Sequence, residues 1–387
     1  FNDLIRYLKE LIKENYLMTR KFEISPTTRL RRSPFFDATV REGVTGFYPY
    51  NNMLMPTGFG HPEEEYWRII NGVSMWDVAV ERQVELNGPD AEKLAQILCP
   101  RNLQQCKEGQ GKYVALCNHS GVIINDPIIL KLSRSRYWLS IADNNIVLFA
   151  RAIAAERGLD VDVFEPDVSP LAVQGPEAEN VIASIFGDWV RELKYFWFKE
   201  AEISGIPLQV ARSGWSKQGG FELYLMDGSK ASELWNLVRE AGKPWNIGPG
   251  NPNMSERIES GLLSYGSDTD DNTNPFEIRM EKYIDLDIPD DTIGIQALRK
   301  IASDGPKRHQ VGVILEGSTP SDIVAEWLDI EQDGKKIGSM TSGVWSRRLE
   351  KNIGLSLIDI NVKIGESAVV KTINGECNCK VVALPFL

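Results

Sequence analysis

Histidine and cysteine are scarce in this chain. Its 387 residues include three histidines and five cysteines. No two histidines stand at metal-ligand spacing, and the one close cysteine pair is Cys377 and Cys379. A zinc-thiolate methyltransferase needs about three soft ligands, so we expect no metal centre. An odd and small number of cysteines is typical of reduced thiols in a cytosol, which predicts a cytoplasmic protein.

Long apolar runs and cofactor-binding loops are also missing. No run approaches the roughly 20 residues of a membrane-spanning helix. No Gly-x-Gly-x-x-Gly pattern follows a strand, which argues against a Rossmann cofactor. Tyr113 breaks the phosphate-loop pattern that begins at Gly109, and Gln218 stands where a nucleophile elbow needs glycine. We therefore expect neither a nicotinamide nor a flavin cofactor, and no serine hydrolase.

Positive charge is in short supply, because the formal net charge is −11. An acidic surface repels polyanions such as nucleic acid and anionic lipid. We expect small-molecule substrates and no nucleic-acid or membrane partner. The basic stretch at Arg29, Arg31 and Arg32 is predicted to be a solvated arm or a landing site for an anionic substrate tail. A homodimer is one possible assembly that the sequence does not decide.

The chain changes character along its length. Residues 1–17 have a helical apolar stripe, and we interpret 1–18 as an N-terminal extension that ends at Met18. Helices are predicted over 144–157, 176–186, 229–241 and 255–263. Strands are predicted over 84–86, 113–117, 122–132, 137–141 and 160–164. After residue 305 only short strands are predicted, over 310–315, 335–340, 354–360 and 368–382.

Six groups of residues carry a further signal. They are 73–78 with 86–91, 111–126, 171–176, 214–222, 257–266 and 341–346. In content and order they resemble the aminomethyltransferase (T-protein) family of the glycine cleavage system. The resemblance implies an α+β fold, a three-domain cloverleaf with folate in a central channel and a C-terminal all-β, barrel-like domain. The implied domains are a folate-binding α+β domain (30–80 and 167–255), a second α+β domain (81–166 and 256–304) and the β domain (305–387).

The departures from the family pattern are informative. The family usually has aspartate at Asn125, Gly-Glu at Lys217 and Gln218, and tyrosine at Trp215. Residues 49–53 and 252–266 look closer to the branch of the family that passes a sulfonium methyl group to tetrahydrofolate. The resemblance therefore implies tetrahydrofolate as the methyl acceptor and a small cation as the methyl donor.

Glu222 matches the pterin anchor of the family. The pterin edge offers parallel N–H donors, which a carboxylate accepts in pairs. Asp126 matches a family aspartate near the reacting nitrogen, and with Tyr224 it is assigned a catalytic role. The alternative interpretations are a solvated strand glutamate at 222 and an ordinary turn aspartate before Pro127.

The remaining candidates are aromatic or basic. A sulfonium binds aromatic faces through cation–π attraction of about 0.5–2 kcal/mol each. Assigned to the cofactor are Trp215, Arg257, Trp345 and Trp197, and assigned to the substrate are Tyr50, Trp189 and Lys217. The alternatives are core packing for each aromatic, with half of the run 195–198 buried at strand spacing, and an ion pair of Arg257 with Glu256 or Glu259.

Three functions compete at this point. The first is a tetrahydrofolate-dependent methyltransferase acting on a sulfonium, with quaternary ammonium donors as an open variant. The second is a T-protein proper, acting on an aminomethyl-lipoyl carrier protein. The third is a folate-binding relative without turnover.

Overall fold

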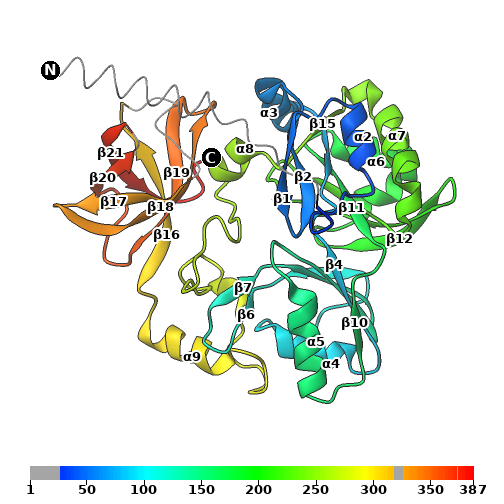
Figure 1. Cartoon of the computed structure of the whole chain (residues 1–387), viewed down its shortest axis with the longest axis horizontal. Helices are drawn as coiled ribbons and strands as arrows, with labels where there is room; N and C mark the ends of the chain where they lie inside the picture. Colours follow the sequence, from blue (N-terminus) through cyan, green and yellow to red (C-terminus); the bar gives the residue numbers. More distant parts are fainter. Residues whose placement is uncertain (1–26, 318–325, 373) are drawn as a thin grey trace.

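The protein forms three lobes (Figure 1). The computed structural model describes residues 27–317, 326–372 and 374–387. The predicted N-terminal extension and its helix lie outside these residues. The lobes are two α+β units and a C-terminal barrel, so the predicted three-domain cloverleaf is confirmed.

The first lobe is built on a six-stranded sheet of order β12-β13-β14-β11-β3-β15. Its strands are β3 (Ser74–Asp77), β11 (Ser169–Gln174), β12 (Phe198–Ile203), β13 (Ile206–Ala211), β14 (Gly220–Leu225) and β15 (Gly248–Gly250). Its helices are α2 (Phe36–Arg41), α3 (Pro62–Asn71), α6 (Ala178–Phe186) and α7 (Ala231–Ala241). Strands β3 and β11 are buried along their whole length, as expected of central strands covered on both faces.

A hairpin of β1 (Gly46–Tyr50) and β2 (Met53–Gly58) extends from this lobe. Its turn residues Asn51 and Asn52 have φ of +50° and +60°. Two successive left-handed residues define a type I′ turn, for which asparagine is well suited. The turn fixes where Tyr50 lies, because Tyr50 is the last residue of β1.

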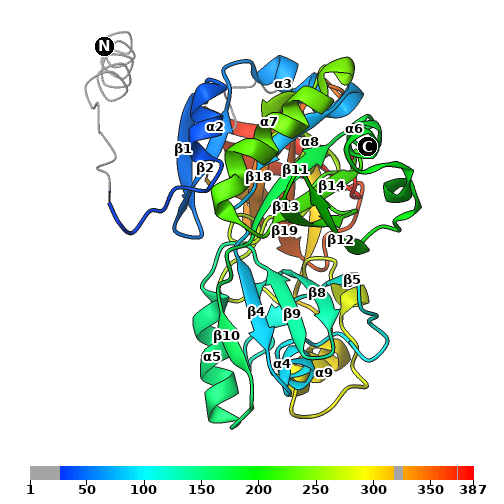
Figure 2. The ribbon, with the colours of Figure 1, turned by 90° about the vertical axis from the view of Figure 1, so that its right-hand side faces the viewer.

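The second lobe has a five-stranded sheet of order β10-β4-β9-β8-β5 and lies below the first in Figure 2. The strands are β4 (Gln83–Asn87), β5 (Gln110–Tyr113), β8 (Ile128–Ser133), β9 (Arg136–Ser140) and β10 (Asp162–Phe164). A ribbon of β6 (Leu116–Cys117) and β7 (Ile123–Asn125) accompanies them, together with helices α4 (Ala91–Leu98), α5 (Ile146–Glu156) and α9 (Ile295–Asp304). We propose that each α+β lobe forms one domain with the boundaries predicted above.

Two predicted strands of this lobe are interrupted. The run 113–117 divides between β5 and β6, and the run 122–132 divides between β7 and β8. Pro127 lies in the second gap, where it has no N–H to give to a strand ladder. The interruption leaves Asp126 outside the strands.

The third lobe is a closed barrel of order β16-β19-β18-β17-β20-β21. Its strands are β16 (Arg308–Leu315), β17 (Leu328–Gln332), β18 (Lys335–Ser346), β19 (Lys351–Asp359), β20 (Ser367–Thr372) and β21 (Gly375–Val382). The short strand predicted over 335–340 is wrong in length, because β18 continues to Ser346 through a register shift between Met340 and Ser342. Such a bulge lets a strand bend around a barrel. The run 368–382 is a hairpin of two strands.

Helix α8 (Met254–Glu259) lies between the barrel and the first lobe (Figure 1). The Asn253 side chain caps it by accepting from Glu256 N at 3.1 Å. At the other end Gly261 has φ of +63°, and Leu262 N donates to Arg257 O at 2.8 Å. This is a Schellman ending, so the predicted helix over 255–263 is too long at its C-terminus.

The run 195–198 does not form a strand as predicted. Phe196 has φ of +62°, and β12 begins at Phe198. A non-glycine residue in the left-handed region marks a turn, so the spacing of alternate strand residues does not apply here. Short 3₁₀ helices lie at Asp188–Glu192, Gly228–Lys230, Lys243–Trp245 and Glu281–Tyr283.

Candidate active site

Glu222 lies on β14 with 2% of its surface exposed. Its Oε2 accepts hydrogen bonds from Ser213 Oγ and, at 3.2 Å, from Tyr224 OH. Burial raises the pKa of Glu222, against the lowering effect of these two bonds. Among the described residues Oε1 has no hydrogen-bond donor, so one oxygen of this carboxyl is free for a ligand.

Tyr224 shares the face of Glu222, because residues two apart on a strand point the same way. The Tyr224 ring packs at 6.2 Å from the ring of Trp138, which comes from the second lobe. Burial raises the pKa of Tyr224 well above its ordinary value, and the charges of Glu222 and Glu81 add to this. The hydroxyl therefore stays protonated and acts as a hydrogen-bond donor to Glu222.

Glu81 was not selected from the sequence, yet it belongs to the same acidic cluster. It lies in the turn after β3, and the preceding carbonyl, Val80 O, accepts from Asn51 Nδ2 at 3.0 Å. Glu81 is partly exposed; its partial burial raises its pKa, and the charges of Glu222 and Asp126 raise it further. We refer to Glu81, Asp126 and Glu222 as the acidic cluster.

Asp126 follows β7 and accepts a 2.7 Å hydrogen bond from Tyr113 OH. Tyr113 in turn meets the ring of Tyr283 edge-on at 5.0 Å. Burial raises the pKa of Asp126 to about 7, although the Tyr113 hydroxyl opposes the shift. Asp126 is partly buried, and with this raised pKa its carboxyl exchanges a proton near neutral pH.

Tyr50 is brought to the cluster by the β1–β2 hairpin. Burial raises the pKa of Tyr50 well above its ordinary value, followed by the charges of Glu81 and Asp126. The hairpin tip is held in place by Asn51, whose Nδ2 also donates to Ala142 O at 2.9 Å. Tyr50 therefore belongs to the first lobe, but its position is fixed by the hydrogen bond of its neighbour Asn51 to the second lobe.

Asn125 replaces a family aspartate, and its contacts give the reason. Its Nδ2 donates to Ala142 O at 3.0 Å, and its Oδ1 accepts from Ala142 N at 3.0 Å. A carboxylate lacks the donor that the first bond needs. Asn125, which directly precedes Asp126 in sequence, therefore holds the loop at residue 142. As an amide it does not act as a second acid.

The loop 213–219 is fixed by motif residues. Gln174 is fully buried; its Nε2 donates to Ser213 O at 3.0 Å and its Oε1 accepts from Ser216 Oγ at 2.8 Å. A Cβ added at Gly214 would lie 2.0 Å from that Nε2. Only glycine fits at 214, so this part of the family pattern shapes the loop that precedes Glu222.

Trp215 and Lys217 leave this loop in different directions. Trp215 Nε1 donates to Leu263 O at 3.2 Å, and the Arg257 guanidinium lies 5.9 Å from the Trp215 ring centroid. Lys217 has an exposed side chain, while its backbone N–H donates to Glu256 Oε1 at 2.9 Å. Trp215 thus packs inward beside α8, whereas the Lys217 ammonium lies on the surface.

Arg257 is fully buried and paired with a residue that the sequence analysis did not name. Its Nη1 lies 2.7 Å from Asp268 Oδ2, and its Nη2 donates to Ser342 Oγ at 2.7 Å. The predicted alternative partners are wrong, since Glu256 accepts from the 217–218 loop and Glu259 pairs with Arg348. Arg257 ties α8 to the barrel, and contact with folate or substrate stays a prediction.

The other aromatic candidates have different surroundings. Trp189 already has a cation over its ring, because Lys199 Nζ lies 4.8 Å from the centroid. Trp197 is half-buried in the turn before β12. Trp345 lies on β18 between Val344, which packs beside Ile258 of α8, and Ser346, which bonds Glu259. Because strand residues alternate, Trp345 faces away from α8.

Tyr195, from the same aromatic run, was missed. Its hydroxyl donates to Gly214 O at 3.5 Å, and more than half of the residue is exposed. Like Tyr113 and Glu81, it follows no periodic pattern. The signal that was available is its place in the aromatic run 195–198.

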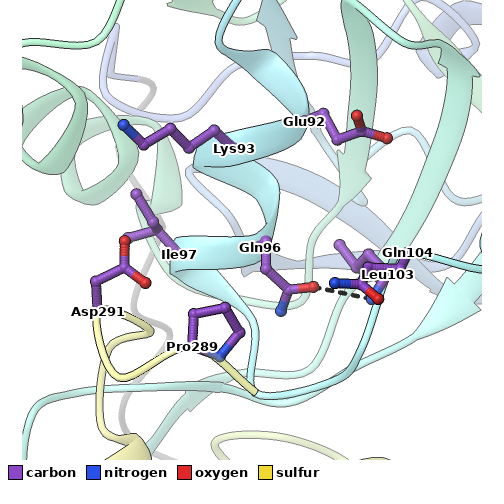
Figure 3. Close-up of a pocket in the computed structure, with 8 residues that line it drawn as sticks. All are labelled: Glu92, Lys93, Gln96, Ile97, Leu103, Gln104, Pro289 and Asp291. Carbon is purple, nitrogen blue, oxygen red and sulfur yellow. Dashed lines mark hydrogen bonds between the residues drawn. The ribbon is translucent and has the colours of Figure 1, made fainter.

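A surface pocket lies elsewhere, on α4 (Figure 3). It is lined by Glu92, Lys93, Gln96, Ile97, Leu103, Gln104, Pro289 and Asp291. None of the candidate residues lines it. Over the ranges that the structure describes, no three His, Cys, Asp or Glu side chains converge as a metal site, and no helix is both long and apolar enough to cross a membrane.

Comparison with known proteins identifies the class. Residues 35–288 match the GCVT N-terminal domain, and residues 308–387 match the glycine cleavage T-protein C-terminal barrel domain. The chain therefore belongs to the glycine cleavage T-protein (aminomethyltransferase) family, as the sequence motifs predicted.

Two curated relatives and one solved structure show which members of the family this chain resembles. The chain is 40% identical over 336 residues to dimethylsulfoniopropionate demethylase DmdA of Ruegeria pomeroyi, which covers 87% of this chain and 91% of the relative. It is 30% identical over 336 residues to an aminomethyltransferase of Caldanaerobacter subterraneus subsp. tengcongensis, covering 85% and 88%. The solved aminomethyltransferase T of Bartonella henselae superimposes with a TM-score of 0.80 at 22% identity, covering 92% and 98%, which confirms the fold.

Proposed function

We propose that this protein is a tetrahydrofolate-dependent methyltransferase that demethylates dimethylsulfoniopropionate, giving 5-methyltetrahydrofolate and methylmercaptopropionate. The observation that carries the proposal is the acidic cluster: burial raises the pKa of Glu222 and of Asp126, and the charges of these two carboxyls raise the pKa of Glu81. Such a cluster favours a bound cation. The relative at 40% identity, named for the same substrate, supports this choice.

The pterin is assigned to Glu222. The free Oε1 of this carboxyl is ready to accept an N–H from the pterin edge, while Ser213 and Tyr224 hold Oε2. Hydrogen bonds to an ionised acceptor are about twice as strong as neutral ones. Binding of the N–H donors favours the carboxylate, which offsets the cost of its burial.

The methyl transfer itself requires little acid–base chemistry. The folate nitrogen N5 attacks the methyl carbon, the carbon–sulfur bond breaks, and its electron pair remains on sulfur as a neutral thioether. The proton on N5 must then leave. Asp126, with a pKa of about 7, suits an acceptor for that proton near neutral pH. Holding the two substrates together supplies about 7–11 kcal/mol.

Incubating the protein with tetrahydrofolate and dimethylsulfoniopropionate tests the proposal, with 5-methyltetrahydrofolate and methylmercaptopropionate measured by mass spectrometry. We expect both products in equal amounts. Release of ammonia from an aminomethyl-lipoyl carrier protein, without methyl transfer, would instead identify a T-protein proper. Folate binding without any product would identify a non-catalytic relative.

We further propose a cytoplasmic enzyme of small-molecule substrates that uses no metal, flavin or nicotinamide and binds neither nucleic acid nor membrane. The net charge of −11 supports the absence of polyanionic partners. A homodimer is proposed as its assembly, and light scattering of the purified protein tests it.

A further inference from the structure

Helix α8 carries three fully buried charged side chains on six residues. They are Glu256, Arg257 and Glu259, each with 0% of its surface exposed. Charged residues are almost never fully buried unless they are paired. Arg257 pairs with Asp268, and Glu259 pairs with Arg348. Among the described residues Glu256 has no such ion-pair partner, so its carboxyl is stabilised in another way.

The Glu256 side chain bonds a loop outside its own helix. Glu256 stands three residues after the cap of α8, where the glutamate of a capping box turns back to the N–H of the cap residue. Here it turns to the loop 213–219: Glu256 Oε1 accepts from Lys217 N at 2.9 Å and from Gln218 Nε2 at 3.0 Å. Ser260 Oγ donates to the same oxygen at 2.9 Å. The side chain therefore joins α8 to a loop of the first lobe.

All three donors meet one oxygen of this carboxyl. The other oxygen, Oε2, is buried, and within the described ranges it has no hydrogen-bond partner. A buried carboxylate without a cation depends on its donors, because leaving it unsatisfied is costly. Hydrogen bonds to an ionised acceptor are about twice as strong as neutral ones. The bonds to residues 217 and 218 therefore hold the loop more firmly than neutral contacts would.

The tip of the loop, at Lys217 and Gln218, depends on Glu256. The start of the loop is fixed within the first lobe, where Gln174 Oε1 accepts from Ser216 Oγ at 2.8 Å. At the tip, the Lys217 side chain is exposed and Gln218 is half-buried. In the part of the chain that the structure describes, the two bonds to Glu256 are the hydrogen bonds found for these tip residues. Glu256 is therefore what fixes the tip.

The same loop carries two groups of the proposed pterin site. Ser213 Oγ donates to Glu222 Oε2. Trp215 lies two residues before the tip, and its Nε1 donates to Leu263 O at 3.2 Å. A shift of the tip would therefore change both the orientation of the Glu222 carboxyl and the placement of the Trp215 ring.

We propose that Glu256 is a positioning residue of the folate site. By tethering the loop tip to α8, it holds the Trp215 ring and the Glu222 carboxyl in place for the pterin. This inference rests on the proposed function and adds to it a residue that acts through others. Because Arg257 and Glu259 tie α8 to the barrel, folate affinity then depends on the contact between α8 and the barrel as well.

The Gln218 side chain suits this tether because its amide is a donor. A glutamate at 218 has no donor to offer, and its charge repels the carboxylate of Glu256. In the double variant Glu256→Gln, Gln218→Glu, the new amide at 256 donates to the new carboxylate at 218. The carbonyl oxygen of that amide still accepts from Lys217 N, so the exchanged pair restores the tether.

The test measures the Kd for tetrahydrofolate by anaerobic calorimetry and the KM for each substrate. The variants are Glu256→Leu, Gln218→Glu, the double variant and the control Glu200→Gln, an exposed glutamate on β12. Replacing buried charge by an apolar side chain of similar volume is often neutral for stability, so Glu256→Leu should unfold at a temperature close to that of the wild type.

We expect the Kd for tetrahydrofolate to rise at least about tenfold in Glu256→Leu and at least about threefold in Gln218→Glu. The double variant and the control should bind within about twofold of wild type. The KM for tetrahydrofolate should rise with the Kd, whereas the KM for dimethylsulfoniopropionate should stay within about twofold, because the tether acts on the pterin alone.

A folded Glu256→Leu variant with a Kd within about twofold of wild type would overturn the proposal. So would a double variant that binds no better than Gln218→Glu, or a joint rise of both KM values. Should Glu256→Leu not fold, Gln218→Glu decides, since an unchanged Kd there also overturns the tether. Wild-type formation of 5-methyltetrahydrofolate separates the two failures: product with an unchanged Kd in the variants rejects only the role of Glu256, and no product rejects the proposed function.

Discussion

Replacing Glu222 by glutamine is expected to damage folate binding almost as much as removing the side chain. Ser213 Oγ and Tyr224 OH both donate to one oxygen of Glu222. A glutamine must turn its carbonyl oxygen toward these donors, because its NH₂ group cannot accept from them. The NH₂ group then points to the place of Oε1 and meets the N–H donors of the pterin.

The size of the effect follows from the bonds lost. A hydrogen bond to a charged group contributes about 1.5–3 kcal/mol, and about 1.4 kcal/mol corresponds to a factor of ten in affinity. Glu222→Gln should therefore raise the Kd for tetrahydrofolate by about 10- to 150-fold. Tyr224→Phe, which removes one of the two donors and leaves Oε1 in place, should raise it by less than about tenfold.

Anaerobic calorimetry of each variant with tetrahydrofolate measures these constants. Glu200→Gln makes the same substitution on an exposed strand position of the same sheet, and it should bind like the wild type. Thermal unfolding shows whether each variant is folded at the assay temperature. A Kd for Glu222→Gln within about twofold of wild type would refute the assignment of Glu222 as the pterin anchor.

Three further outcomes are expected. Asn125→Asp loses the donor to Ala142 O and should lower the free energy of unfolding in urea by about 1–3 kcal/mol; an unchanged midpoint would contradict this. Asp268→Ala leaves Arg257 buried without its ion-pair partner and should cost about 3–5 kcal/mol, seen as a lower melting temperature. The kcat/KM of wild type should rise with pH through about 7, where Asp126 becomes ionised and able to accept a proton, and Asp126→Asn should abolish this limb of the profile.

The periodic parts of the fold were predictable from the sequence. The helix predicted over 176–186 is α6 at Ala178–Phe186, and the one over 229–241 is α7 at Ala231–Ala241. Both have an apolar stripe against a sheet, which a window of residues reveals. The errors fall where a single residue decides the backbone, as at Phe196 with its positive φ and at Gly261 after α8.

The site was less predictable for a related reason. Glu222 and Asp126 were found because they occupy family motifs, whereas Glu81 lies outside the motifs, and Tyr113 lies in the motif 111–126 without a pattern that distinguishes it from its neighbours. Their surroundings are formed by segments distant in the sequence, which no local pattern predicts. Arg257 lies in a motif that the sequence reveals. Its partner Asp268 lies in an irregular segment, where no helical or strand period predicts which residues meet.

The acidic cluster unites contributions from different lobes, and this has a consequence for catalysis. Glu222 comes from the sheet of the first lobe, Asp126 from the second, and Glu81 from the connection between them. In the proposed mechanism, the distance between Glu222 as pterin anchor and Asp126 as proton acceptor is therefore set by how the lobes dock. Asn51, whose side chain contacts both Val80 O and Ala142 O, spans that junction at the hairpin tip. Since an error of about 1 Å in placement is enough to cost about a hundredfold in rate, we expect this asparagine to position the reacting groups through the lobe junction rather than by contact with a substrate.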